Sequence, residues 1–175
     1  IRSVDKVIEE ARLLRDTAET KTIYFVDDVF GLDSKWMFGF LPKFKEKVAL
    51  PFICLVRADV VCRNEKYAQY LADYGCMSAC FGIESGDEKM RNTILNKNVS
   101  DKSLYEAADR LHKAGVKFRT FNIMGLPGET LEDAFRTLQM NIDMKTDYPW
   151  CSMFMPFPGT KLTECLCSHG EENAI

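Results

Sequence analysis

The sequence predicts an α/β fold with parallel strands, arranged as a sheet or a barrel. Short apolar runs of strand length alternate with amphipathic segments of helix length, and the pair repeats at intervals of about 30 to 40 residues. The apolar runs do not alternate with polar residues, which is expected when helices cover both faces of a sheet or a barrel closes on itself. One domain is expected over residues 1–175, because this length and composition suit a single core.

The first half of the chain begins with an amphipathic helix over residues 3–17. Val4, Val7, Ile8, Ala11 and Leu14 recur there at helical spacing. The segments expected next are a strand at 21–28, a helix at 34–48 despite Pro42, a strand at 51–57 and a helix at 64–74 closed by Gly75.

The second half continues the same alternation. A strand is expected at 77–84, followed by a loop or short helix, and then by a helix that Ser100 and Asp101 cap and Gly115 ends. The inner face of that helix consists of Leu104, Ala107, Ala108 and Leu111. The remaining segments are a strand at 116–124, a helix at 131–145, a strand at 149–155 and a short helix at 161–167.

Composition argues against several classes of function, although a specific RNA or lipid substrate stays open. The formal net charge of −3 argues against a broad electrostatic surface for nucleic acid or anionic membrane. No apolar stretch approaches the roughly 20 residues that span a bilayer, and the amino end does not resemble a signal peptide. The seven cysteines are scattered, partly within apolar runs, which suits buried reduced thiols. We therefore expect a cytoplasmic protein.

The loop at residues 121–130, FNIMGLPGET, is the strongest local signal. An apolar strand ends at Gly125, Pro127 stiffens the turn to Gly128, and Thr130 with Asp133 resembles a capping box that starts the next helix. Glycines allow positive φ and let backbone amides approach a ligand. The alternative is an ordinary turn between a strand and a helix.

Polar or glycine-rich groups follow every predicted strand. They are Asp27 and Asp28; Arg57 and Asp59; Glu84, Ser85 and Gly86; residues 125–129; and residues 155–160. The carboxyl ends of parallel strands meet at one edge, where ligands bind in α/β folds. Each cluster also has a structural alternative: the aspartates could cap a helix, Glu84 could pair with Arg57, and the prolines near residue 156 could stop a helix.

At these residues the chain resembles the radical S-adenosylmethionine (SAM) superfamily. The similar segments are FVDDVF (25–30), RADVV (57–61), FGIESGDEKMRNTILNK (81–97), FNIMGLPGET (121–130) and PFPGTKL (156–162). The similarity is greatest to the branch often linked to an N-terminal cobalamin-binding domain, which includes methyltransferases and anaerobic magnesium-protoporphyrin ester cyclases. It implies a partial (β/α)6 barrel that lacks its first strand and cluster loop here, and a chain that is a fragment of a longer protein.

The resemblance also implies a site for SAM beside a four-iron four-sulfur cluster. Asp27 and Asp28 match positions near the methionine amino group, while Glu84 and Ser85 match positions near methionine or ribose. The segment containing Ile123, Gly125, Pro127 and Gly128 matches the adenine motif, with Phe154 and Pro156 on the other side. Arg119 is a further candidate for a carboxylate contact, and Arg57 belongs to the same predicted edge.

The family's cluster is held by a CxxxCxxC motif, which this chain lacks. Cys76 and Cys80 have the first spacing, but Ile83 occupies the third place, and side chains along a strand cannot converge on one metal. Cys165, Cys167 and His169 provide at most three ligands near the terminus, and we interpret them as incidental. We therefore predict no metal ligands within this chain and expect it to be inactive alone.

Three interpretations follow from the sequence. The first is the cofactor-binding core of a radical SAM enzyme, with an electron donor such as flavodoxin or ferredoxin and a small-molecule substrate, acting in methylation or oxidative cyclisation. The second is a non-redox module that binds a nucleotide or phosphate through the glycine loop and the following helix N-terminus. The third is a scaffold fragment without a ligand.

Overall fold

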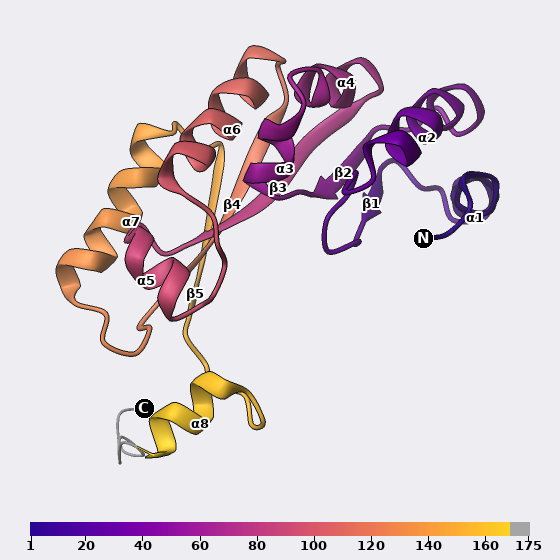
Figure 1. The fold of residues 1–175 in the computed structure, drawn as a ribbon. Helices are drawn as coiled ribbons and strands as arrows, with labels where there is room; N and C mark the ends of the chain where they lie inside the picture. Colours follow the sequence, from indigo (N-terminus) through magenta and orange to yellow (C-terminus); the bar gives the residue numbers. More distant parts are fainter. Residues whose placement is uncertain (169–175) are drawn as a thin grey trace.

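The computed structural model describes residues 1–168, with side chains up to residue 164. One five-stranded sheet contains β1 (Ile23–Phe25), β2 (Phe52–Leu55), β3 (Cys76–Glu84), β4 (Lys117–Met124) and β5 (Tyr148–Met153). All neighbouring pairs are parallel, and the strands lie side by side in sequence order (Figure 1). A doubly wound sheet would reverse its order at a switch point. The fold is therefore α/β with the strand order of a partial barrel, as predicted.

The helices alternate with these strands. They are α1 (Val4–Thr17), α2 (Ser34–Lys47), α3 (Ala58–Arg63), α4 (Tyr67–Asp73), α5 (Glu88–Thr93), α6 (Asp101–Lys113), α7 (Leu131–Asp143) and α8 (Lys161–Ser168). The predicted caps are confirmed: Ser100 caps α6, and Thr130 forms a capping box with Asp133 at the start of α7. Among the described residues, no helix is both long and apolar enough to cross a membrane.

Two predicted elements differ from the structure. The helix expected at 64–74 begins only at Tyr67, because Asn64 is extended and its side chain accepts a hydrogen bond from the Lys66 N–H (2.9 Å), which competes with helix formation. The strand expected at 21–28 has only three residues. Beyond it, the Phe30 N–H bonds to the Leu55 carbonyl oxygen (2.7 Å), so a loop satisfies the end of β2.

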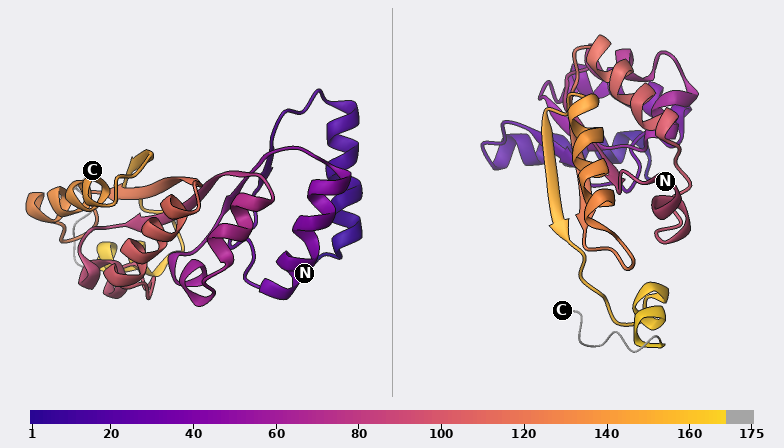
Figure 2. Two further views of the ribbon diagram at one scale, coloured as in Figure 1. Left: turned by 90° about the horizontal axis from the view of Figure 1, so that it is seen from above. Right: turned by 90° about the vertical axis from the view of Figure 1, so that its left-hand side faces the viewer.

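Helices cover only one face of the sheet. Along β4, Phe118, Thr120 and Asn122 are buried, whereas Lys117 and Arg119 are exposed. Figure 1 shows α6 and α7 together beside β4, and Figure 2 shows the same layer from two other directions. Of the two arrangements expected from the uniformly apolar strands, the described residues therefore do not form a sheet covered on both faces, and their strand order agrees with the alternative of a barrel. We call the uncovered side the open face.

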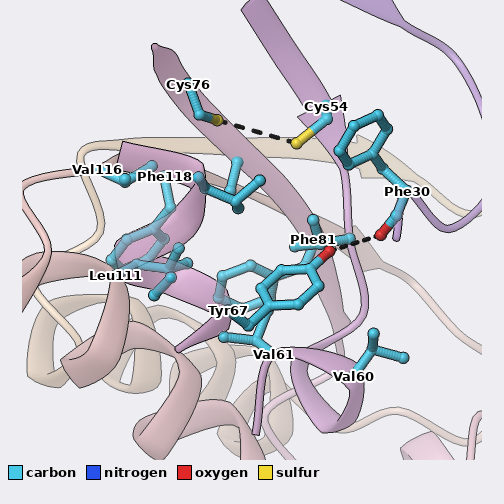
Figure 3. Close-up of a cluster of buried hydrophobic side chains, with 14 of the residues drawn as sticks. Phe30, Cys54, Val60, Val61, Tyr67, Cys76, Phe81, Leu111, Val116 and Phe118 are labelled. Atoms are coloured by element: carbon cyan, nitrogen blue, oxygen red, sulfur yellow. Dashed lines mark hydrogen bonds between the residues drawn. The ribbon is translucent and has the colours of Figure 1, made fainter. Parts of the chain in front are cut away.

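The core lies between the sheet and its helices. Phe25 packs against four other phenylalanine rings at centroid distances of 5.1 to 5.6 Å: Phe30, Phe40, Phe44 and Phe52. The Tyr67 hydroxyl donates to the Phe30 carbonyl oxygen (2.5 Å), which ties the loop after β1 to α4 (Figure 3). Cys54, Cys76 and Cys80 are buried free thiols, in agreement with the sequence.

A buried arginine joins the end of β3 to the start of α6. Arg91 is fully buried, its Nε donates to the Val99 carbonyl oxygen (2.9 Å) and its Nη1 donates to the Ser85 carbonyl oxygen (2.8 Å). Its Nη2 also pairs with the carboxylate of Asp101. Buried carbonyl groups outside regular structure need donors. Arg91 supplies two of them and thereby fixes the segment at 85–100.

We predict that Arg91→Met lowers the free energy of unfolding by about 3 to 5 kcal/mol, because it leaves two buried carbonyls without donors and Asp101 without its partner. Urea unfolding measures this change. Arg63→Met is the matched control, since Arg63 is 61% exposed in its ion pair and should contribute less than about 1 kcal/mol. Equal losses for the two variants would contradict the prediction.

Candidate functional site

Glu84 occupies a strained position at the carboxyl end of β3. Its φ is +64°, which is unfavourable for a residue with a side chain, and the register with β4 shifts between Gly82 and Glu84. The Glu84 carboxylate lies over Gly82: a Cβ at Gly82 would be 1.8 Å from Oε1 of Glu84. Such strain persists where the surrounding structure enforces it, often at functional sites.

Lys97 is the partner of Glu84. Its Nζ lies 2.5 Å from Oε1, and the two side chains are 22% and 19% exposed. Lys97 comes from the loop between α5 and α6, where Asn96 and Asn98 adopt positive φ and turn the chain. Its own N–H bonds to the Arg91 carbonyl oxygen (3.3 Å). Arg91 therefore supports the backbone beside both residues of the ion pair, at Ser85 next to Glu84 and at Lys97 itself.

Sequence reasoning did not select Lys97. The alternative in which Glu84 pairs with Arg57 is also absent, because Arg57 Nε instead binds Asp59 Oδ1 (2.8 Å). The Arg57 Nη2 donates to the Lys97 carbonyl oxygen (3.4 Å), so Arg57 supports the same loop. The available signal was the run Asn96-Lys97-Asn98, since asparagines on both sides of a lysine favour a tight, left-handed turn.

Asp59 balances the positive charge next to this pair. Burial acts to raise the pKa of its carboxyl, but the hydrogen bonds and charges of Arg57 and Arg63 outweigh burial and hold the pKa below its ordinary value. Asp59 therefore stays ionised and paired. This leaves the Glu84–Lys97 pair as the partly exposed ionic group at the end of β3.

The glycine loop after β4 is occupied by its own carboxylate. Gly125 and Gly128 have φ values of +78° and +77°. Glu129 folds back so that its Oε2 accepts from the N–H of Gly125 (2.5 Å) and from the N–H of Leu126 (3.3 Å). Its Oε1 is buried without a hydrogen-bond partner among the described residues. The loop amides of Gly125 and Leu126 are thus already paired with an anionic group of the protein itself.

The two aspartates after β1 are exposed, and their carboxylates have no partners among the described side chains. Among residues 1–164, whose side chains are described, neither the Asp27 nor the Asp28 carboxylate forms a hydrogen bond or an ion pair, and Asp33 is the residue that caps α2. The alternative that they cap a helix is therefore wrong. Asp27 borders a cavity of about 470 Å³ between α1, β1 and the start of α2.

The remaining predicted residues separate into three groups. Ile123, Pro127, Phe154 and Pro156 are partly buried beside one another at the carboxyl ends of β4 and β5, where the Phe154 N–H bonds to the Met124 carbonyl oxygen (2.7 Å). Ser85 is fully buried, and its hydroxyl accepts from the Asp87 N–H (3.2 Å), so it shapes the loop. Arg119 lies near the amino end of β4, away from this edge.

Among the described side chains, no group of three His, Cys, Asp or Glu residues could hold a metal ion. Cys76 and Cys80 lie within β3, as predicted. The candidate formed by Cys165, Cys167 and His169 lies outside the described side chains.

Comparison with known proteins gives consistent results. The chain is 30% identical over 162 residues to an uncharacterized methyltransferase of Pyrococcus horikoshii, covering 93% of this chain and 35% of that protein. It therefore spans about a third of the length of this relative.

Solved structures share the fold. TsrM, a radical SAM methyltransferase from Kitasatospora setae solved with cobalamin and a [4Fe-4S] cluster, superposes with a TM-score of 0.81 at 15% identity, covering 96% of this chain and 34% of TsrM. The cobalamin-dependent radical enzyme OxsB, solved with aqua-cobalamin and SAM, gives a TM-score of 0.65 at 18% identity, covering 97% of this chain and 26% of OxsB.

The family model of the radical SAM superfamily matches residues 1–140, which is most of the chain. This match agrees with the partial barrel and with the polar groups at its carboxyl edge. The chain belongs to the radical SAM superfamily.

Proposed function

We propose that this chain binds SAM along the carboxyl edge of the sheet, as the cofactor-binding core of a radical SAM enzyme. The Glu84–Lys97 pair carries the proposal. SAM presents an ammonium and a carboxylate on one carbon atom, and a carboxylate beside an ammonium on the protein complements both. The pair is partly exposed, and the backbone of Glu84 is strained. Both features are typical of residues at a binding site.

The rest of the edge supports the same ligand. Ile123, Phe154 and Pro156 form a partly buried apolar surface suited to adenine. Asp27 and Asp28, which follow β1 two strands away from β3, have carboxylates without partners among the side chains described for residues 1–164 and add acceptors on the ammonium side of the edge. Ser85 and Arg119 are not needed as direct contacts in this arrangement.

The phosphate-binding interpretation has less support. It requires free backbone donors in the glycine loop and at the N-terminus of α7. Glu129 already accepts from two of the loop amides, and Thr130 with Asp133 caps the helix. A phosphate would have to approach these carboxylates and would be repelled by them.

The described side chains fit SAM better than they fit the iron-sulfur cluster. In such enzymes a four-iron four-sulfur cluster supplies the electron that cleaves SAM and starts radical chemistry. Because the described side chains contain no set of three ligands, we propose that the cluster ligands lie outside them. An electron donor such as flavodoxin or ferredoxin and a small-molecule substrate complete the reaction. Likeness to TsrM and OxsB favours a cobalamin-dependent methylation, with oxidative cyclisation as the second candidate.

We predict that Glu84→Gln and Lys97→Met each weaken SAM binding about 10-fold or more, since each removes a charge-assisted hydrogen bond to the ligand. Isothermal titration calorimetry of the full-length protein measures the affinity. Glu132→Gln is the control, because Glu132 is 77% exposed and lies on α7 away from the pair. Unchanged affinity in both site variants would remove the main support for this site.

A second prediction changes shape without changing charge. Gly82→Ala should weaken SAM binding several-fold, because its Cβ would displace Glu84 Oε1 and Lys97 Nζ, now 1.8 and 2.5 Å from that position. Gly39→Ala is the matched control, since nothing lies within 4 Å of the corresponding Cβ. If both alanine variants bind SAM equally well, the arrangement over Gly82 is not part of the site.

The activity is tested in the full-length protein, purified and reconstituted with iron and sulfide without oxygen. We expect dithionite to drive release of 5′-deoxyadenosine and methionine, or methyl transfer to substrate with S-adenosylhomocysteine as product. Chromatography detects all three products. A reconstituted cluster with SAM left intact, in the presence of candidate methyl acceptors and cobalamin, would count against the proposal.

A further inference from the structure

The open face carries a cluster of cationic and aromatic side chains that the SAM site does not use. Arg119 is in register with Cys80 on one side and Tyr148 on the other. Two residues along, Phe121 is in register with Gly82 and Trp150. Partners in register share a face, as do residues two apart on one strand. Arg119, Phe121, Tyr148 and Trp150 therefore form one surface, which we call the inner patch.

The positive charge of the inner patch is not neutralised locally. Arg119 is exposed, and its side chain forms no hydrogen bond or ion pair with the side chains and backbone described for residues 1–164. Burial raises the pKa of the Cys80 thiol, and the positive charge of Arg119 opposes that rise, so the guanidinium lies near Cys80 over the open face. Lys117, on the same face, lies 5.7 Å from the centre of the Tyr148 ring. None of the residues in register with Lys117 to Phe121 on this face is acidic.

The aromatic part lies next to this charge. Phe121 and Trp150 pack edge to face at 5.8 Å, and Trp150 remains 51% exposed. An exposed indole beside a phenyl ring favours a flat apolar ligand. A free guanidinium favours a carboxylate or phosphate, which it can bind with two parallel hydrogen bonds.

The patch also adjoins the proposed SAM site. Gly82, which lies beneath the Glu84–Lys97 pair, is the register partner of Phe121. A ligand on the aromatic rings would therefore lie beside a cofactor held by that pair. Proximity of this kind is what a reaction between substrate and cofactor needs.

We propose that the inner patch binds the substrate, and that the substrate is a planar aromatic or heteroaromatic compound with an anionic carboxylate or phosphate group. The aromatic pair would hold the ring system and Arg119 the anion. That this ligand is the substrate rests on the proposed function, whereas its binding depends only on the inner patch.

Calorimetry with four probes tests this in the full-length protein: 2-naphthoate, 2-naphthyl phosphate, 2-naphthol and cyclohexanecarboxylate. We expect at least one naphthyl anion to bind about 10-fold more tightly than 2-naphthol and cyclohexanecarboxylate. The stronger of the two anions identifies carboxylate or phosphate as the preferred group. Arg119→Gln should remove the preference over 2-naphthol, and Trp150→Leu the preference over cyclohexanecarboxylate.

Two controls separate the possible failures. Arg12→Gln, on the exposed side of α1, should leave binding of every probe unchanged. Arg119→Lys should restore part of the anion preference if the variant is folded. SAM is titrated into the same proteins. If no probe binds while SAM still binds, the substrate inference alone is overturned; this is the result expected if another part of the protein covers the inner patch. The inference is also overturned if Arg119→Gln binds the naphthyl anions as tightly as the unchanged protein does. Probe binding without SAM binding would overturn the proposed function alone.

Discussion

The guanidinium of Arg91 is the constraint on which the candidate site depends. It bonds the carbonyl of Ser85, directly after Glu84, and the carbonyl of Val99, shortly after Lys97, while the Arg91 carbonyl accepts from Lys97 itself. Through its side chain and its own carbonyl group, Arg91 thus supports the backbone next to both members of the ion pair. Burying a guanidinium is costly unless its donors are satisfied, so the segment can adopt few other arrangements.

The strained backbone of Glu84 directs its carboxylate into the space that Gly82 leaves free. Its left-handed backbone turns the carboxylate onto the sheet, and the missing side chain of Gly82 leaves room for it. Gly86 extends this arrangement to α7, because a Cβ there would lie 2.4 Å from the backbone nitrogen of Thr137. Glycines on both sides of Glu84 therefore have steric reasons to be glycine. The ion pair is therefore already in place before a ligand binds, which lowers the cost of ordering these side chains on binding.

Much of the fold could be predicted from local patterns. Helix caps such as Ser100 and Thr130 have side-chain signals, and the order of strands and helices follows from apolar periodicity. The carboxyl edge was also predictable, because parallel strands place their ends together. Lys97 was not, since its contact with Glu84 spans a loop whose path depends on a buried arginine. The role of Glu129 was equally hidden: spacing cannot show that a carboxylate folds back onto the glycine loop. The open face could not be assigned from the strands alone, because an apolar strand has the same pattern in a sheet covered on both faces and in a barrel.

The most direct measurement is a crystal structure of the full-length protein with SAM. We expect the methionine ammonium within hydrogen-bond distance of Glu84, about 3 Å, the methionine carboxylate toward Lys97, and adenine against Ile123 and Phe154. SAM bound elsewhere, for example in the cavity between α1 and α2, with the Glu84–Lys97 pair untouched, would contradict it.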